Sequence, residues 1–296
     1  MTSMADSAAG RLRSLIPAPR PWIYPILLVL PSCMFLLIFY FYPLVHLIPQ
    51  SFLMDGGVSL RQFIRLCGDS LALDTLLSTF KIALAVTAIT LGIGYPVAYL
   101  ISRVRPRTAA LLLAVIVLSF WISILVRTYS WMVLLQRFGM VNKGLMALGL
   151  LTQPIKLMYN QFAVSVGMVH ILLPFMILPI YASLKAMDQN LIQAAMTLGA
   201  SPRQAFLRVT LPLSVNGMAA GVLLVFVQGL GFYVTPMLLG GPQTLMVSSL
   251  IDRQMFNYLD WSYGSAISLV LLLCTVLFML VFDRCFGLET LNKRTE

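Results

Sequence analysis

Six runs of about 20 apolar residues constrain what this chain can fold into more than any other feature of its sequence. A run of that length is long enough to cross about 30 Å of hydrocarbon as a helix. Charged residues make up only 10% of the chain, against about 25% in a typical soluble domain. We therefore predict an all-α polytopic membrane protein with six transmembrane helices. The expected spans are 23–42, 81–102, 109–128, 162–184, 215–239 and 263–282.

The distribution of basic residues predicts the orientation of these spans. A net charge of +10 would suggest a nucleic-acid ligand in a soluble protein, but in a membrane protein basic residues concentrate in cytoplasmic loops. With both termini inside, 12 of the 20 Lys and Arg residues fall on the cytoplasmic side, three of them in the short loop Arg103–Arg107. We expect an N-in, C-in topology, with cytoplasmic tails at 1–22 and 287–296 around a transmembrane domain at 23–286, and no nucleic-acid partner.

The connection between the fourth and fifth spans, residues 185–213, has the signals of two short helices around one sharp turn. We call this segment the elbow. A helix is expected over 190–198, and Gly199 suits the left-handed position that ends it. Ser201 is a good N-cap and Pro202 fits the first helical position, so a second helix follows and is expected to stop before Pro212. Such a rigid projection is suited to receive force from a partner protein.

Motifs in the elbow resemble a known family. Gln193-Ala194-Ala195-x-x-x-Gly199, followed ten residues later by Val209-x-Leu211-Pro212, closely resembles the E-A-A-x-x-x-G-x9-I-x-L-P loop of permease subunits in binding-protein-dependent ABC importers. Two other segments, 121–135 and 231–246, are similar to the spermidine/putrescine branch of that family. The resemblance implies a type I (MetI-like) importer permease with six spans.

The resemblance also implies partners. In such importers the elbow is a coupling loop that docks on a cytoplasmic ABC ATPase dimer. The family's usual Glu is Gln193 here, which loses a charge and keeps the hydrogen-bonding shape. A second permease subunit, related but different, a periplasmic solute-binding protein and a location in the bacterial inner membrane are implied as well. The residues that the resemblance places in the coupling loop are Gln193, Ala194, Ala195, Gly199, Ser201, Pro202, Arg203, Phe206 and Arg208.

The same comparison implies a cargo. Polyamine permeases commonly read Gly-Asp-Phe-Val-Thr-Pro where this chain has Gly231-Phe232-Tyr233-Val-Thr-Pro, so an aromatic replaces a carboxylate. A cation could then rely on cation–π contacts, on backbone carbonyls or on acids of a second subunit. We expect putrescine or spermidine, with another small amine, an amino acid or an opine-like solute as alternatives. Candidate residues of the substrate path are Gln228, Phe232, Tyr233 and Asp252.

Several motifs are absent from the sequence. It contains no G-x-x-x-x-G-K-[ST] phosphate loop, so we expect ATP and Mg to be bound by the partner ATPase and no cofactor by this chain. No catalytic constellation and no metal-ligand spacing stand out, which indicates a permease rather than an enzyme. A proton-coupled secondary transporter, which would place acids or His within the membrane, and a non-transporting membrane scaffold are the alternatives.

Overall fold

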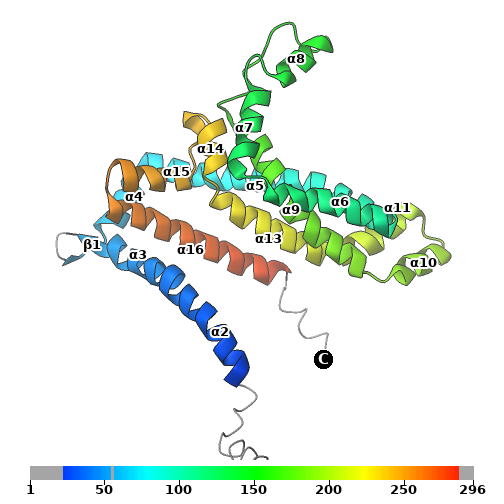
Figure 1. Ribbon diagram of the computed structural model, residues 1–296, viewed down its shortest axis with the longest axis horizontal. Coiled ribbons are helices and arrows are strands. Elements are labelled where there is room, and N and C mark those ends of the chain that lie inside the picture. Colours follow the sequence, from blue (N-terminus) through cyan, green and yellow to red (C-terminus); the bar gives the residue numbers. More distant parts are fainter. Residues whose placement is uncertain (1–22, 55–56, 287–296) are drawn as a thin grey trace, which may run out of the picture. The chain divides into compact units, whose positions relative to one another are not determined.

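The computed structural model describes residues 23–54 and 57–286, and it is helical apart from one short strand pair (Figure 1). Strand β1 (Leu53–Met54) pairs antiparallel with β2 (Gly57–Val58), with Leu53 opposite Val58. The prediction of an all-α protein is therefore confirmed. The tails predicted at 1–22 and 287–296 lie outside the described residues.

The chain divides into two units, of which the first comprises Met1–Gln50. The helical run that begins in this unit consists of α2 (Ile23–Leu36), the π-helical turn η1 (Leu37–Phe41) and α3 (Tyr42–Phe52). The stretch Leu28–Phe52 is long and apolar enough to cross a membrane, so the helix continues ten residues past the expected end at residue 42. Side chains from Leu28 to His46 are exposed, as suits a helix that faces lipid.

The second unit comprises Ser51–Glu296 and contains the remaining described elements. Their bounds are α4 (Arg61–Gly68), α5 (Ser70–Arg103), α6 (Pro106–Leu118), η2 (Ser119–Trp121), α7 (Ile124–Leu135), α8 (Met140–Ala147), α9 (Gln161–Ala186), α10 (Gln189–Thr197), α11 (Pro202–Ala205), η3 (Phe206–Thr210), α12 (Leu211–Leu213), α13 (Val215–Leu230), α14 (Val234–Leu239), η4 (Pro242–Thr244), α15 (Val247–Asp252), η5 (Arg253–Asn257) and α16 (Trp261–Phe286). 

Three helices of this unit, α5, α9 and α16, are long and apolar enough to cross a membrane. They contain the expected spans 81–102, 162–184 and 263–282. Helix α5 begins at Ser70 rather than at residue 81, because Asp69 caps it by accepting hydrogen bonds from the backbone N–H groups of Leu71 (3.0 Å) and Ala72 (3.3 Å).

Two of the expected spans are interrupted. Residues 109–128 do not form one helix, because the backbone leaves the helical region at Ile122 and Ser123. The segments Pro106–Trp121 and Ile124–Ala147 meet there at 96°. The expected span 215–239 is broken as well, since α13 ends at Leu230 and α14 begins at Val234. The described residues hold four helices that could cross a membrane, or up to six spans if two bent pairs each count as one. These pairs are Pro106–Trp121 with Ile124–Ala147, and Pro202–Leu213 with Val215–Leu230.

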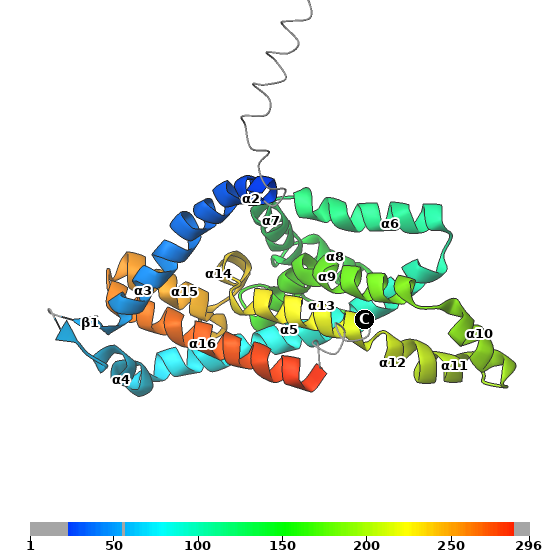
Figure 2. The same cartoon turned by 90° about the horizontal axis from the view of Figure 1, so that it is seen from below.

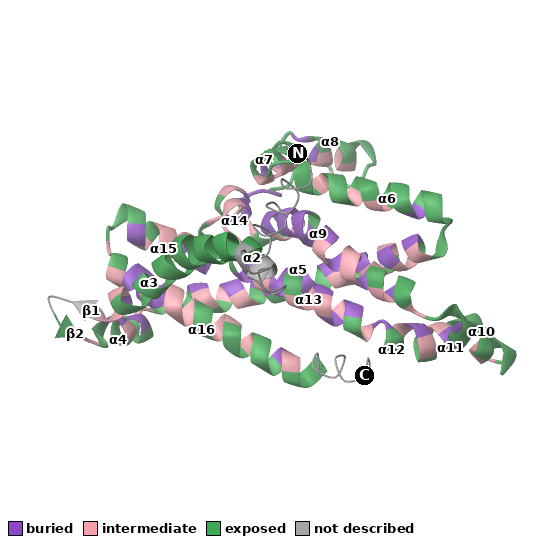
Figure 3. Cartoon of the chain, turned by 60° about the horizontal axis from the view of Figure 1, so that its bottom comes forward, coloured by how far each residue is buried: buried purple, intermediate pink, exposed green. Residues whose placement is uncertain are grey.

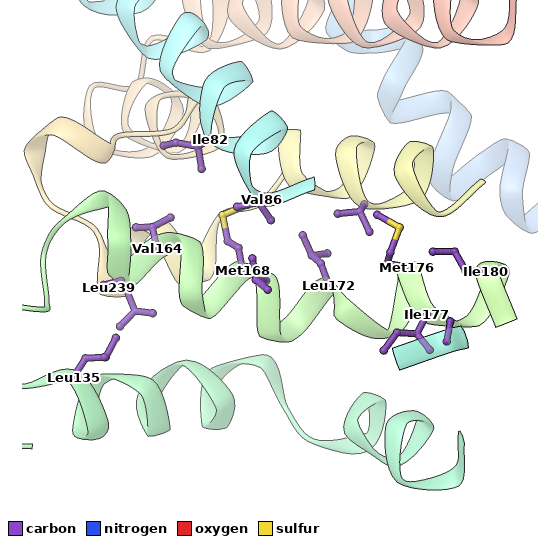
Figure 4. Close-up of a cluster of buried hydrophobic side chains, with 14 of the residues drawn as sticks. Ile82, Val86, Leu135, Val164, Met168, Leu172, Met176, Ile177, Ile180 and Leu239 are labelled. Atoms are coloured by element: carbon purple, nitrogen blue, oxygen red, sulfur yellow. The ribbon is translucent and has the colours of Figure 1, made fainter. Parts of the chain in front are cut away.

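Helix α9 forms the centre of the second unit and packs against α5 and α13 (Figure 3). Figure 4 shows Met168, Leu172 and Met176 of α9 in the same apolar cluster as Ile82 and Val86 of α5. Lipid is as apolar as these side chains, so close packing rather than water exclusion stabilises the contact.

Two glycines on α13 permit that close approach. A Cβ atom built on Gly217 would lie 2.7 Å from the Pro179 carbonyl oxygen of α9, and one on Gly221 would lie 2.7 Å from the sulfur of Met176. Real Cβ contacts are not that short, so any larger residue would push α13 away from α9.

The elbow occupies one end of this bundle. Figure 2 shows α10 and α11 at one end, and α4 and α15 at the other. Arg103 is the last residue of α5, Arg105 lies in the loop that follows, and Arg107 lies in the first turn of α6. This connection lies at the same end as the elbow, because Tyr99 of α5 contacts Phe206 of the elbow. One end of the bundle thus holds the elbow together with Arg103, Arg105 and Arg107, and the other end holds α4 and α15.

Candidate functional site

The first half of the elbow folds as its sequence predicts. Helix α10 begins after Asp188, whose carboxylate accepts a hydrogen bond from the Asn190 N–H (2.9 Å). It ends at Thr197, and Gly199 follows two residues later with φ +90°. The N–H of Ala200 donates to the Ala195 carbonyl and that of Gly199 to the Met196 carbonyl, both at 3.0 Å. This pattern is a Schellman motif, and it confirms the left-handed cap.

The second half of the elbow begins as predicted and ends later. Ser201 and Gln204 form a reciprocal capping box, and Pro202 occupies the first helical position. The expected stop before Pro212 is wrong, since the helical segment runs from Pro202 to Leu213. Proline lacks the N–H for a regular α-helical bond and its ring clashes with the carbonyl four residues earlier. The chain passes through the π-helical turn η3 directly before Pro212, which changes the hydrogen-bonding pattern at this point.

Most of the residues predicted for coupling are exposed on the elbow. Gln193, Ala194 and Gly199 are exposed on its first half, and Ala195 is half-buried. On the second half the exposed residues are Ser201, Pro202, Arg203 and Arg208. 

Leu198 at the tip is 87% exposed, and sequence reasoning did not select it. The signal available was its position directly before the cap glycine, where the side chain leaves the helix face. The elbow therefore exposes one apolar side chain at its turn, in addition to the two cations of its second half.

Phe206 is an exception, because it faces the bundle. Its ring lies 5.1 Å from that of Tyr99 and 6.1 Å from that of Tyr95, edge to face in both cases. The guanidinium carbon of Arg103 lies 5.1 Å from the centre of the Tyr99 ring, and the Tyr95 hydroxyl hydrogen-bonds to that of Ser214 (3.0 Å). Phe206 thus joins the elbow to α5 rather than offering a free contact.

Ser214 marks a bend in the chain. The segments Pro202–Leu213 and Val215–Leu230 meet there at 57°. Ser214 is fully buried, and its hydroxyl also donates to the Leu211 carbonyl (2.9 Å). The elbow is therefore joined to α5 at two points, at Phe206 and at this bend.

At the opposite end, two of the four predicted path residues come together. Tyr233 and Asp252 line one pocket of about 610 Å³ with Tyr159, Arg253 and other residues of α14 and α15. The Tyr233 phenol lies close enough to the Asp252 carboxylate to interact with it electrostatically. Tyr159, which sequence reasoning missed, has φ +59°. Nothing in the local sequence signals that conformation.

The other two predicted path residues lie elsewhere. Phe232 packs against the central apolar cluster, and its carbonyl accepts a hydrogen bond from Ser248 (2.6 Å). Gln228 is exposed on α13 and does not line the pocket. The structure therefore places Phe232 in packing and Tyr233 in the pocket.

A second pocket of about 650 Å³ shares Tyr159 with the first. Its charged lining residues are Arg137 and Lys156, and the rest is mainly apolar, with Met132, Leu157 and Met158 among them. Two neighbouring hollows thus differ in charge, since the first contains a carboxylate and the second only cations.

A polar network holds the helices at this end together. Arg65 of α4 forms an ion pair with Asp260 (2.7 Å), and its guanidinium carbon lies 4.1 Å from the ring centre of Tyr263. The Tyr263 hydroxyl donates to Asp69 (2.7 Å), the residue that caps α5. These contacts fix the starts of α5 and α16 relative to each other.

The family model described as binding-protein-dependent transport system inner membrane component matches residues 91–288. The chain is 36% identical over 268 residues to the spermidine/putrescine transport system permease protein PotB of Escherichia coli (strain K12), which covers 88% of this chain and 96% of that protein. It is 40% identical over 210 residues to the protein of the same name from Haemophilus influenzae, or 71% of this chain and 73% of that one.

Solved structures with a similar fold belong to transporters. A chain of a bacterial ABC transporter involved in the import of the acidic polysaccharide alginate matches with a TM-score of 0.72 at 18% identity, over 90% of this chain and 95% of that one. A chain of the alginate transporter in complex with its alginate pentasaccharide-bound periplasmic protein matches with a TM-score of 0.75 at 18% identity, over 89% and 93%. At this identity the similarity concerns the fold.

Proposed function

The chain belongs to the binding-protein-dependent transport system inner membrane components, and from this premise we propose that it carries polyamines such as putrescine and spermidine. Its family and its fold confirm the predicted type I importer permease, so it is the transmembrane permease subunit of an ABC importer in the inner membrane. A proton-coupled transporter and a non-transporting scaffold are set aside by that membership. The observation that carries the cargo is the 36% identity to PotB over 88% of this chain.

We propose that the elbow faces the cytoplasm, which is the N-in, C-in topology. In support, the elbow lies at the same end of the bundle as the loop Arg103–Arg107, and basic residues in short loops mark the cytoplasmic side. The pockets with Asp252 and with Arg137 then lie toward the periplasm, where a solute-binding protein would deliver its cargo.

The exposed tip of the elbow is suited to an ATPase partner. Leu198 offers an apolar contact, and Arg203 and Arg208 offer positive charge. ATP and Mg would be bound by a cytoplasmic ATPase dimer, and this chain would hold no cofactor. Closure of that dimer would move the elbow, and Phe206 would pass the movement to α5 through Tyr95 and Tyr99. A second permease subunit, related but different, would form the other half of the path.

The pocket with Asp252 has the chemistry that an organic ammonium group requires. A carboxylate supplies the opposite charge, and the rings of Tyr159 and Tyr233 supply negative faces for cation–π contact. Arg253 also lines the pocket and limits the space for further positive charge. Asp252 therefore binds one ammonium end of the solute in this proposal.

Uptake of labelled putrescine and spermidine into membrane vesicles that hold the complete transporter tests this proposal. We expect saturable, ATP-dependent uptake of both polyamines, and we expect that amino acids and opines do not inhibit it. Asp252→Asn should raise KM about tenfold or more, because a hydrogen bond to a charged group contributes about 1.5–3 kcal/mol. Asp74→Asn is the matched control, since Asp74 is an exposed acid of the same unit outside the pocket.

Two results would contradict the proposal. If the vesicles take up only zwitterionic or anionic solutes, the cargo is wrong. If Asp252→Asn and Asp74→Asn raise KM equally, the pocket is not the ammonium site and the loss of charge acts from a distance.

A further inference from the structure

Arg127 has donor groups that the described structure leaves without acceptors. It lies in the second turn of α7, directly after the break at Ile122 and Ser123. Its Nε and Nη1 atoms are buried, and neither has a hydrogen-bond partner among residues 23–54 and 57–286. The residue as a whole is half-buried, so part of the guanidinium can still be reached from outside the chain.

The polar side chains around Arg127 are already engaged. Trp131 donates from its indole N–H to Nδ1 of His170 (3.2 Å), and His170 is the group close enough to interact electrostatically with Arg127. A His that accepts at Nδ1 carries its proton on the other nitrogen, so it has no lone pair for a guanidinium. Thr128 bonds to the Ile124 carbonyl (2.8 Å) and to Thr235 (3.1 Å).

No carboxylate of residues 23–54 and 57–286 forms an ion pair with Arg127. The sequence contains no Asp or Glu between Asp74 and Asp188, a range that includes α6, α7, α8 and α9 entirely. Helix α14, which also packs against α7, contains none either. A buried guanidinium without a counter-ion costs several kcal/mol. The described residues therefore do not supply the missing acceptor.

We propose that Arg127 forms an ion pair with a carboxylate of the second permease subunit. The inference rests on the proposed function, which requires that subunit. Helix α7 presents apolar side chains beside Arg127, with Val126 56% and Tyr129 54% exposed, as a membrane-embedded contact surface would. A polyamine cannot serve as the counter-ion, because it is itself a cation. An uncompensated Arg127 would repel a cationic cargo that passed near it, and a carboxylate from the other subunit would remove that repulsion.

Co-purification of the two permease subunits tests this pairing without any solute. In the complete transporter, Arg127→Gln should reduce the amount of second subunit recovered with this chain by roughly tenfold or more in detergent, since the partner's acid is left unpaired. The amount of this chain in the membrane should stay unchanged. Lys143→Gln is the matched control, because Lys143 is an exposed cation of α8 that lines neither pocket, and it should leave recovery unchanged.

A charge swap then identifies the partner residue. Arg127→Glu should abolish recovery, and one replacement of an Asp or Glu in the spans of the second subunit by Arg should restore it. Recovery of the second subunit at wild-type level with Arg127→Gln would overturn the inference, as would a complete set of acid replacements without rescue. If Arg127→Gln keeps the subunits together and removes only solute-stimulated ATPase activity, Arg127 binds an anionic group of the solute instead.

These outcomes are separate from a failure of the proposed cargo. Subunit recovery needs no solute, so it can depend on Arg127 even if the vesicles reject putrescine and spermidine. Conversely, normal polyamine uptake with an Arg127→Gln chain that retains its partner would leave the cargo intact and overturn only the pairing.

Discussion

Replacing Gly199 by Ala should weaken the docking of the partner ATPase on the elbow. Gly199 has φ +90°, a conformation that is unfavourable for residues with a Cβ atom. A Cβ placed there would meet no atom of the described chain within 4 Å. The substitution therefore changes the backbone preference of the elbow and removes no contact.

The size of the effect follows from the change in backbone preference alone, because no contact is removed. A left-handed backbone costs a residue with a Cβ about 1–2 kcal/mol. The free variant can relax out of this conformation, but docking must restore it, so the binding free energy bears the cost. A loss of about 1–2 kcal/mol corresponds to a 5- to 30-fold weaker affinity. Gly199→Asn should lose less, because Asn tolerates the left-handed region better than Ala.

The assay is titration of purified ATPase subunit onto the permease complex in nanodiscs. Gly149→Ala is the matched control, because Gly149 has φ +72° and equally open surroundings but lies in the outer segment after α8. Its affinity for the ATPase should equal that of the unaltered chain. An affinity within twofold of the original for Gly199→Ala would refute the reasoning, and so would an equal loss for Gly149→Ala, which would indicate a global effect.

Two further predictions concern packing. Phe206→Ala should uncouple ATP hydrolysis from solute binding, because it removes the ring contact with Tyr99. In a double-mutant cycle with Tyr99→Ala, measured by solute-stimulated ATPase activity, the coupling energy between the two rings should be about 0.5–1.5 kcal/mol. A coupling energy near zero would mean that the ring contact transmits nothing. Gly217→Ala should lower the melting temperature of the complex, because the new Cβ would meet the Pro179 carbonyl and overpacking costs about 1–3 kcal/mol. Gly92→Ala, with nothing within 4 Å of the new Cβ in the described chain, should not lower it, and equal losses would contradict the argument.

Long apolar runs and capping signals could be interpreted from sequence because each depends on local chemistry. The helices around residues 81–102, 162–184 and 263–282 follow from length and composition, and the turn at Gly199 and Ser201 follows from residues that suit few other conformations. The breaks after Trp121 and Leu230 could not be predicted in the same way. Hydropathy measures how apolar a segment is, and residues 109–128 remain apolar straight through the 96° bend.

The contacts that join distant segments could not be predicted from the sequence for a different reason. Phe206 reads as part of an amphipathic helix, and only the fold brings it against Tyr99, 107 positions earlier in the chain. Tyr159 joined the pocket through a backbone conformation that its neighbours do not signal. As adjacent aromatics, Phe232 and Tyr233 were equally good candidates for the pocket when only the sequence was considered. In the structure Tyr233 lines the pocket and Phe232 packs in the core, because the two side chains point in different directions after the break.

The length of helix α5 would magnify a movement that the elbow passes to it. It is 34 residues long, which corresponds to about 51 Å at 1.5 Å per residue. Tyr95 and Tyr99 hold its inner part, while at its outer part Thr79 accepts a hydrogen bond from the Val247 N–H (2.9 Å), the first residue of α15. A tilt of about 10° about the inner end would displace the outer end by roughly 9 Å over that length. Helix α15 carries Asp252, so under the proposed coupling a small movement of the elbow would become a larger one at this pocket wall.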